Sequence, residues 1–334
     1  VSEENFQGSR LAIIMNGSPL FTGDAGSGES EIRRWLLEND LVEGIVAMPD
    51  QLFYNTGIST YIWILTNNKN RLRRGKVQLV NGVDFYQKMR KSLGNKRNEI
   101  SDEQINELVR IYGDMKPGEN CKLFDKEDFG YQKITVERPL RLNFKIDEER
   151  VQGLYNQTAF KNLATTGKRG AVGLKESEEG EKLQKQIIEA LLSIKADTIY
   201  KNRAEFTKKI RRLFKAKEIE LKAPLLKALL TALSEKDETA DICRDAKGKP
   251  EPDPDLRDTE NVPLKEDIYE YFAREVKPHV PEAWIDEKKT KIGYEIPFTR
   301  HFYKYTPLRS SAEILEEIKE LEASIAEKMK KVLE

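Results

Sequence analysis

The chain has 334 residues, of which 38% are hydrophobic and 34% are charged, so it can form two or three domains with a large solvated surface. Lys plus Arg and Asp plus Glu both number 57, which gives a formal net charge of zero. This balance excludes the global basic field of many small DNA-binding domains. Any contact with nucleic acid must therefore use local patches or a partner subunit.

Cysteine content favours a reducing compartment, and hydropathy argues against a membrane-spanning segment. The cysteines, Cys121 and Cys243, are far apart and lie outside any CxxC spacing, so we expect neither a disulfide framework nor a zinc site. No run of eighteen apolar residues occurs, and the first residues, VSEENFQGSR, lack the form of a signal peptide. We expect a soluble cytoplasmic protein without a membrane partner. Because the chain begins at Val1 and enters a strand almost at once, we also expect a fragment or a processed chain.

The first 85 residues predict the closing part of an α/β sheet. Arg10–Met15 is a short apolar run that we expect to form a buried strand, and a helix should follow from about Ser30. A strand after that helix gives a β-loop-α-β unit typical of doubly wound sheets, which need several more strands upstream. The helix should bury Ile32, Trp35, Leu36 and Asn39. The later strands are expected at 41–48, 61–65 and 76–80.

The stretch from Leu41 to Thr66 carries the strongest functional signal. Two apolar runs flank the loop Pro49–Ser59, which is too long and too mixed in composition for a simple hairpin turn. Long loops on rigid strands commonly carry binding chemistry, and Phe53 and Tyr54 could stack on an unpaired base. The alternative is an ordinary connection in which these two rings only complete a core.

Three basic stretches could contact phosphates. The first, at 69–76, follows the strand that leaves the loop, and the second lies at 88–97. From these two, the DNA-phosphate candidates are Arg71, Arg73, Arg74, Lys76, Arg90 and Lys91. The third stretch, at 201–217, contains Lys208, Lys209, Arg211 and Arg212. For the third, a solvated helix face is an equally good interpretation.

Beyond residue 84 the predicted elements no longer follow the α/β pattern. Phe85–Ser92 predicts a short basic helix or turn, and 136–144 an extended segment. Ser101 and Gln104 have the spacing of a capping box at a helix start. The face of that helix should bury Ile105, Leu108, Val109 and Tyr112.

Helical sequence dominates from Asp147. A mobile glycine-rich loop is expected at 165–180 and a proline-rich linker at 234–261. The aromatic segment 293–305 should dock against another part of the protein. The expected helices lie at 182–194, 204–214, 221–233 and 265–277.

The end of the chain has a heptad period. Apolar residues alternate in steps of four and three, which predicts a coiled-coil seam of about three heptads. The seam consists of Ile314, Ile318, Leu321, Ile325 and Val332. The helix could pair with another helix, or it could lie on its own domain.

No catalytic side chain can be assigned. His279 and His301 are the only histidines, and neither lies near a nucleophile elbow. Neither a Walker A motif nor a GxGxxG motif is present, and Gly23, Gly26 and Gly28 have the wrong spacing for a phosphate loop. We therefore assign no catalytic, cofactor-binding or metal-ligating residue.

Four blocks together resemble one family. They are RLAIIMNGSPLF, IRRWLLENDLVEGIVAMPDQLFYNTGISTYIWILTN, the helix start SDEQI, and GYEIPFTRHFYKY. With these blocks the chain resembles the C-terminal portion of the modification (M) subunit of type I restriction-modification systems. That resemblance implies a Rossmann-like DNA adenine methyltransferase, which transfers a methyl group from S-adenosylmethionine to the 6-amino group of adenine.

The family's two defining motifs are missing from the chain. They are the acidic glycine turn that holds the cofactor and the (N/D)PP(Y/F) tetrapeptide; both precede RLAIIM in the family order. We therefore expect no cofactor bound to this fragment and no activity from it alone. The resemblance assigns Phe53 best to the ring against the flipped base. The rest of the implied target-base pocket is Tyr54, Asn55, Thr56, Gly57, Ser59, Asn16 and Pro19.

The resemblance also implies partners and a division of the chain. Double-stranded DNA, a specificity (S) subunit, a second modification subunit and a restriction (R) subunit are expected, with the heptads pairing with the specificity subunit. The expected segments are 1–85 (the end of the α/β domain), 86–145 (an extension), 146–262 (helical, with mobile loops) and 263–334 (docking segment and terminal helix). Two alternatives stay open: an assembly module without catalysis, and a complete DNA-binding protein of other ancestry.

Overall fold

A computed structural model describes residues 8–194, 198–305 and 307–333, with side chains up to residue 330. The chain divides into two compact units. Unit 1 comprises Val1–Tyr131 and Gly293–Glu334, and unit 2 comprises Gln132–Ile292. The helices in the described part are all too short or too polar to cross a membrane.

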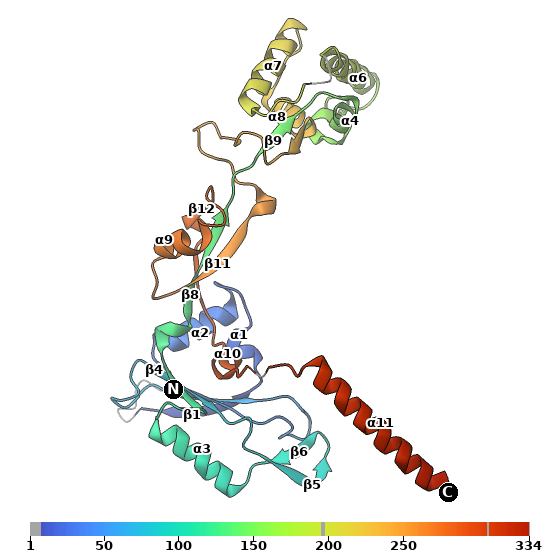
Figure 1. Cartoon of the computed structure of the whole chain (residues 1–334). Helices are drawn as coiled ribbons and strands as arrows, with labels where there is room; N and C mark the ends of the chain where they lie inside the picture. Colours follow the sequence, from blue (N-terminus) through green and yellow to red (C-terminus); the bar gives the residue numbers. More distant parts are fainter. Residues whose placement is uncertain (1–7, 195–197, 306, 334) are drawn as a thin grey trace. The chain divides into compact units, whose positions relative to one another are not determined.

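Unit 1 is built on a mixed five-stranded sheet with the order β1-β3-β2-β4-β7. Helices α1 and α2 lie over one face and α3 over the other (Figure 1). The α/β prediction is therefore confirmed. The strands of unit 1 are β1 (Arg10–Met15), β2 (Val42–Ala47), β3 (Tyr61–Thr66), β4 (Lys76–Asn81), β5 (Gln87–Leu93), β6 (Lys96–Glu99) and β7 (Cys121–Asp125). Its helices are α1 (Ser18–Phe21), α2 (Gly28–Glu38), α3 (Asp102–Asp114), α10 (Phe298–Phe302) and α11 (Ser311–Leu333).

The predicted β-loop-α-β unit is present with a strand inserted into it. β1 and β2 both run antiparallel to β3, which lies between them, so they are parallel to each other. β2 is parallel to β4, and β7 closes the other side in antiparallel register. The carboxyl ends of β1, β2 and β4 consequently meet at one edge of the sheet, where β3 begins.

The burial expected for β1 and α2 is wrong. β1 is an edge strand that pairs only with β3 among the described residues, and Ile13, Ile14 and Met15 are 42%, 55% and 38% exposed. In α2, Ser30, Arg33 and Leu37 are buried, whereas Ile32 and Trp35 are exposed. Side chains on both faces of β1 are exposed because, within the described chain, no strand pairs with its outer edge and no segment covers the adjacent faces.

Helix α3 begins as predicted. The Ser101 side chain accepts from the Gln104 amide at 3.3 Å, and the Gln104 side chain accepts from the Ser101 amide at 3.0 Å, which completes the capping box. Its predicted buried face is only partly correct, because Leu108 is buried while Ile105 and Val109 are exposed. Phe85–Ser92 is not a helix or turn: most of it forms β5, which pairs with β6 in a hairpin.

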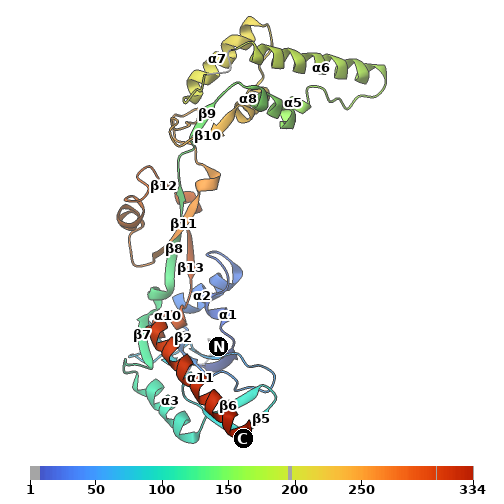
Figure 2. The same cartoon turned by 45° about the vertical axis from the view of Figure 1, so that its right-hand side comes forward.

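Unit 2 contains a helical core and a small sheet (Figure 2). The helical core is centred on side chains such as Phe144, Phe160, Phe206 and Leu229, and the sheet packs Ile134, Val136 and Val262 against Phe272. The strands are β8 (Gly130–Glu137), which crosses the unit boundary, β9 (Leu142–Phe144), β10 (Ser234–Lys236), β11 (Asp258–Pro263), β12 (Trp284–Ile285) and β13 (Lys291–Tyr294), at the other boundary. The helices are α4 (Glu148–Gln152), α5 (Thr158–Lys161), α6 (Ala171–Leu192), α7 (Arg203–Ala216), α8 (Ala223–Ala232) and α9 (Ile268–Tyr271).

The glycine-rich loop expected at 165–180 is wrong for its second half, which is the start of α6. A Cβ at Gly180 would lie 1.9 Å from the Leu163 carbonyl oxygen, and one at Gly173 would lie 2.2 Å from that of Lys168. These glycines therefore serve close packing of the helix against the preceding backbone rather than mobility.

Two other expectations for unit 2 need correction. The proline-rich stretch 234–261 is not a free linker, because β10 pairs with β9 and the Cys243 amide donates to the Leu140 carbonyl. The helix expected at 265–277 is shorter and irregular: α9 passes into a π-helical turn, Phe272–Val276. The helices expected at 204–214 and 221–233 are confirmed as α7 and α8, with small shifts at their ends.

Candidate nucleic-acid interface

The carboxyl edge of the sheet gathers the segments that the sequence singled out. Met15 at the end of β1 and Ala47 at the end of β2 both pair with Tyr61 at the start of β3. Asn16 and the loop Pro49–Ser59 therefore leave the sheet at the same edge. Open α/β sheets bind their ligands at this kind of edge.

The loop is ordered by its own turns and by the β5–β6 hairpin. Phe53 and Thr56 form a β-bridge, and the Gln51 amide donates to the Gly57 carbonyl at 3.3 Å. The buried Asn98 of β6 donates to the Asp50 carbonyl at 3.0 Å and to its carboxylate at 3.1 Å. The loop conformation is thus fixed by long-range contacts.

Gly94 allows the hairpin to approach the loop closely. Its φ is +64°, and a Cβ there would lie 2.7 Å from the Tyr54 carbonyl oxygen. The neighbouring Asn95 amide donates to that same carbonyl at 3.0 Å. Only glycine combines this backbone conformation with the space that is left.

The two aromatic rings differ in exposure. Phe53 is half-buried, whereas Tyr54 is 64% exposed and the Lys96 ammonium lies 5.4 Å from its ring centroid. Asn55 and Gly57 are exposed, and Thr56 and Ser59 are half-buried. The loop therefore presents an open aromatic ring beside a cation, a combination that suits stacking on a base next to a phosphate.

Asn16 and Pro19 lie at the same edge, but they line a different surface. They belong to an apolar cavity of about 460 Å³ between α2 and the β1–β3 face, together with Ile13, Trp63 and Leu65. The loop 49–59 contributes nothing to its lining. The structure thus brings the loop residues together and leaves Asn16 and Pro19 in a separate cavity.

The six phosphate candidates have different surroundings. The side chains of Arg71, Arg90 and Lys91 are exposed and make no ion pair or hydrogen bond within the described chain. Arg74 is exposed, and its guanidinium donates to the Lys69 carbonyl at 3.4 Å. The Lys76 ammonium is paired with the Asp125 carboxylate. Arg73 is only 5% exposed.

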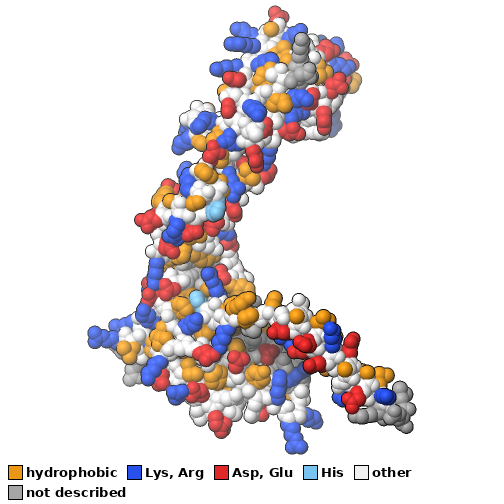
Figure 3. Space-filling model, viewed as in Figure 1, with side chains coloured by type: hydrophobic (Ala, Val, Ile, Leu, Met, Phe, Trp, Pro, Cys, Tyr) orange, Lys and Arg blue, Asp and Glu red, His pale blue; other side chains and the backbone are white. Residues whose placement is uncertain are grey.

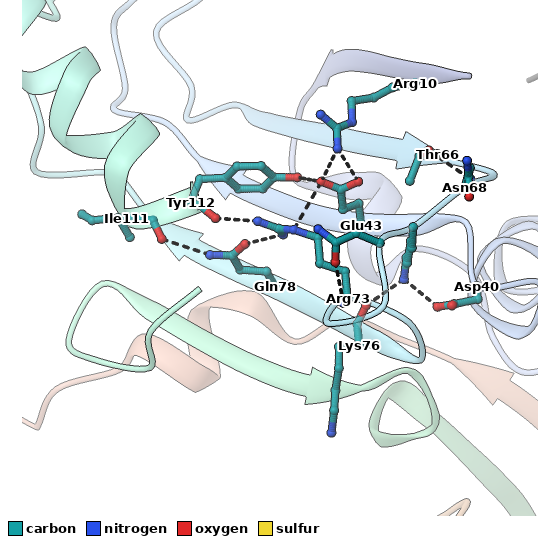
Figure 4. A network of polar contacts seen from close by, with 12 residues as sticks. Arg10, Asp40, Glu43, Thr66, Asn68, Arg73, Lys76, Gln78, Ile111 and Tyr112 are labelled. Carbon is teal, nitrogen blue, oxygen red and sulfur yellow. Dashed lines mark hydrogen bonds and ion pairs between the residues drawn. The ribbon is translucent and has the colours of Figure 1, made fainter. Parts of the chain in front are cut away.

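Arg73 belongs to a buried polar network around Glu43 (Figure 4). Its guanidinium donates to Gln78 Oε1 at 2.7 Å and to the Tyr112 carbonyl at 2.6 Å, and lies 3.6 Å from the Glu43 carboxylate. Arg10 donates to both carboxylate oxygens of Glu43, at 3.0 and 2.9 Å. These contacts occupy Arg73 inside the chain.

Tyr112 completes this network from α3. Its hydroxyl donates to the Glu43 carboxylate, and burial together with that carboxylate raises the pKa of Tyr112. A Cβ at Gly44 would lie 2.9 Å from the Tyr112 ring, so the ring needs glycine at that position. Sequence reasoning missed Glu43, although a lone acid inside the apolar run VEGIVA is itself a signal for a buried ion pair.

Lys69 in the same turn is also withdrawn from solvent. It is 4% exposed, and its ammonium donates to the Asp40 carboxylate at 2.6 Å and to the Lys76 carbonyl at 2.7 Å. Burial lowers the pKa of Lys69, and the hydrogen bond to Asp40 partly offsets that shift. Much of the basic turn 69–76 therefore holds the sheet to its own loops.

The aromatic segment near the end of the chain docks on unit 1, as predicted. The buried Arg33 donates to the Tyr294 carbonyl at 2.6 Å, and the Ile296 amide donates to the Leu20 carbonyl at 2.8 Å. The Phe298 ring meets that of Tyr61 edge-to-face at 5.3 Å. These contacts fix α10 beside the start of β3, at the edge that carries the loop.

Sequence comparison assigns this part of the chain to a family. Residues 3–137 match the model of the N-6 DNA Methylase family, so this region, which includes the loop, belongs to that family. The family uses S-adenosylmethionine. The chain is homologous to methylase subunits of type I restriction-modification systems.

Individual relatives agree with this assignment. The chain is 32% identical over 112 residues to the type I restriction enzyme MjaIX methylase subunit of Methanocaldococcus jannaschii; this match covers 34% of the chain and 19% of the relative. It is 40% identical over 73 residues to the HindI methylase subunit of Haemophilus influenzae, covering 22% and 15%. The matched part thus spans about a fifth or less of these relatives.

A solved structure with similarity to the chain is the methyltransferase subunit of a type I restriction-modification system from Streptococcus thermophilus. It shares 24% identity at a TM-score of 0.31, over 36% of this chain and 24% of that one.

The glycine-rich turn after α1 does not fit the cofactor. The glycine-rich turn after α1 is folded onto itself, and a Cβ at Gly23 would lie 2.3 Å from Ser27 Oγ and 3.0 Å from the Glu29 carboxylate. A carboxylate close to a filled turn leaves no cradle for the cofactor there.

Proposed function

We propose that this chain is the C-terminal portion of a type I modification subunit that methylates the 6-amino group of adenine in DNA. In this proposal the loop Pro49–Ser59 forms one wall of the pocket for the flipped base. The observation that carries the proposal is the exposed Tyr54 ring beside Lys96, on a loop within the family-matched residues.

The geometry suggests how the loop would work. Half-buried Phe53 is placed to close the base of the pocket, and Tyr54 is free to stack on the extruded adenine. Stacking on an aromatic ring contributes about 1–3 kcal/mol per base. Of the phosphate candidates, Arg71, Arg90 and Lys91 are open for the flanking backbone, because Arg73 is held by Glu43 and Gln78.

We further propose that the cofactor half of the site is supplied by sequence outside these 334 residues, so that the chain alone is inactive. The support is β1, whose apolar side chains are exposed and whose outer edge has no strand partner among the described residues. An apolar strand with an open edge suits continuation of the sheet. The Rossmann-like architecture is proposed on the same basis.

The terminal helix is proposed to bind the specificity subunit, with DNA, a second modification subunit and the restriction subunit completing the complex. All described side chains of α11 are exposed, including Ile314 (39%), Ile318 (46%), Leu321 (62%) and Ile325 (56%). The helix thus buries no apolar face against its own domain, and its regular seam suits pairing in trans. Val332 lies outside the described side chains.

The base-pocket proposal is tested in the complete subunit with Phe53→Ala and Tyr54→Ala. We expect methylation to fall on the order of tenfold or more, since a stacking contribution is lost, while binding of S-adenosylmethionine remains near normal. The matched control is Tyr303→Ala, which removes a ring that is 73% exposed. Unchanged turnover in both loop variants would refute the proposal.

Two further measurements test the other parts. Calorimetric titration of this chain with S-adenosylmethionine should show no saturable binding, and micromolar binding would show that the cofactor site is present.

Ile318→Asp with Leu321→Asp should abolish copurification with the specificity subunit. Leu315→Asp, which changes an apolar residue off the seam, should not. If the seam double variant and the Leu315→Asp control copurify equally with the specificity subunit, the subunit binds to a part of the chain other than the seam of α11.

A further inference from the structure

Helix α7 in unit 2 presents one strongly basic face. Its Lys208, Arg211, Arg212 and Lys215 are spaced i, i+3, i+4 and i+7, and all four are exposed. The opposite face is anchored, because Phe206, Ile210 and Phe214 are at most 1% exposed in the helical core. The orientation of the cations is therefore fixed by packing.

These four cations have no partner within the described chain: no ion pair or hydrogen bond involves their side chains. The neighbouring Lys209 differs, since its ammonium is held by the Tyr200 hydroxyl and lies 4.6 Å from the ring centroid. Glu205 is the only acid in the helix and lies in its first turn. Four like charges within about 10 Å of helix, at 1.5 Å per residue, repel one another unless an anion binds them.

An open pocket of about 970 Å³ continues this basic face. Its charged lining consists of Arg141, Arg203, Lys208, Arg211 and Arg244 against Asp241, Asp245 and Glu251. All three carboxylates accept hydrogen bonds within the chain, but only Glu251 is paired with a cation, so Asp241 and Asp245 keep their negative charge. Glu251 pairs with Arg203, Asp241 accepts from the Asn202 amide at 2.8 Å, and Asp245 accepts from the backbone amides of 247 and 249 at 2.8 and 2.9 Å.

Among the cations, Arg203 is paired with Glu251 and Arg141 with Glu282, whereas Lys208, Arg211 and Arg244 form no ion pair within the described chain. The side chain of the exposed Arg244 donates one hydrogen bond, of 2.9 Å, to the Gly248 carbonyl, and those of Lys208 and Arg211 donate none within the described chain. Lys and Arg side chains gather over α7 in the space-filling view (Figure 3). The pocket and the helix face together form a continuous surface with a net positive charge, which we call the α7 surface.

We propose that the α7 surface binds the phosphate backbone of double-stranded DNA. A row of cations along a helix matches an anion that repeats along a line, as phosphates do. The pocket lining contains no aromatic side chain, so it lacks the stacking platform of single-strand binders. The surface lies outside the family-matched residues 3–137 and is distinct from the loop; the choice of DNA rests on the proposed function.

The test measures binding of the whole 334-residue chain to a fluorescein-labelled duplex of about three helical turns, by anisotropy at several salt concentrations. The variant Lys208→Gln with Arg211→Gln removes two cations of the surface. The matched control, Lys182→Gln with Lys185→Gln, removes two exposed and unpaired cations of α6 in the same unit. Thermal unfolding of each variant confirms that the fold is intact.

The slope of log K against the logarithm of the salt concentration should become less steep by about 1.8 in the α7 variant, the value for two lost phosphate contacts. Binding of the duplex should weaken on the order of tenfold or more at about 0.15 M salt. The control should match the wild type. Absence of duplex binding by the wild type would overturn the proposal and would favour an acidic protein as the occupant. Equal loss in both variants would also overturn it, because duplex binding would then not depend on the α7 surface. Because neither cofactor nor methylation enters this assay, its failure leaves the test of Phe53 and Tyr54 unaffected.

Discussion

The basic turn 69–76 and helix α7 are both rich in Lys and Arg, yet their side chains have opposite surroundings. In the turn, Lys69 and Arg73 are buried and paired with Asp40 and Glu43, carboxylates from a preceding turn and from β2. In α7 the exposed side chains of Lys208, Arg211, Arg212 and Lys215 form no ion pair with any carboxylate of the described chain. The density of cations in a sequence therefore does not determine how much charge a surface offers. What decides it is whether the fold brings acids to the same place.

The largest expected effect is at Arg73. Arg73→Ala should reduce the free energy of unfolding by about 3–5 kcal/mol, because it leaves the Glu43 carboxylate buried with one fewer partner. Urea denaturation measures the change. Arg211→Ala on α7 is the control and should stay within about 0.5 kcal/mol. If the two variants lost similar amounts of unfolding free energy, the distinction between buried, paired cations and exposed, unpaired cations would be contradicted.

Lys69 should give an intermediate effect. Lys69→Met keeps the buried stem but removes the ammonium from the Asp40 carboxylate and the Lys76 carbonyl, which we expect to cost about 1–2 kcal/mol of unfolding free energy. Lys208→Met is the matched exposed control and should leave the denaturation midpoint nearly unchanged. A stability gain in Lys69→Met would show that desolvation of the ammonium outweighs its hydrogen bonds.

His301 extends the comparison to a half-buried base, for which the nearby Asp128 carboxylate does not outweigh the effect of burial. It lies against the Phe124 ring at a centroid distance of 4.2 Å, its Nε2 is unpaired, and burial lowers its pKa below the ordinary value of 6.5. The unfolded chain then takes up the proton more readily than the folded chain. Stability should fall as the pH drops below the ordinary histidine pKa and should level off below the folded pKa.

The smallest expected effect is therefore a pH dependence. Unfolding at about pH 7 and about pH 5 should show a loss for the wild type that is smaller in His301→Gln, which cannot titrate. Substitution of His279 by Gln is the control for the remaining histidine. An identical pH dependence in the wild type and His301→Gln would show that His301 does not contribute.

Local signals predicted some elements well. The capping box at Ser101 needs only neighbours three residues apart, and the heptad spacing of α11 is likewise internal to the helix. The two flanking apolar runs also located the loop Pro49–Ser59. The α/β class followed from the order of apolar runs, because each run needs a layer to cover it.

Other features depended on contacts between distant residues, and sequence reasoning failed there. The sequence of β5 predicts a short helix or turn until the strand pairs with β6, whose Asn98 donates to the loop at Asp50. Gly173 and Gly180 suggest a mobile loop until the backbone of the preceding segment is seen against them. Such contacts have no local period or motif.

The sequence by itself determined the family of residues 3–137, the order of apolar runs around the loop, and the helix starts, since these are encoded in short-range patterns. The tertiary structure alone decided which aromatic ring of the loop is exposed. It also decided which cations form ion pairs with Glu43 and Asp40, and which cations on α7 have no partner within the described chain. The reason is physical: burial and ion pairing are set by residues far apart in the chain, and only folding brings them within a few ångströms.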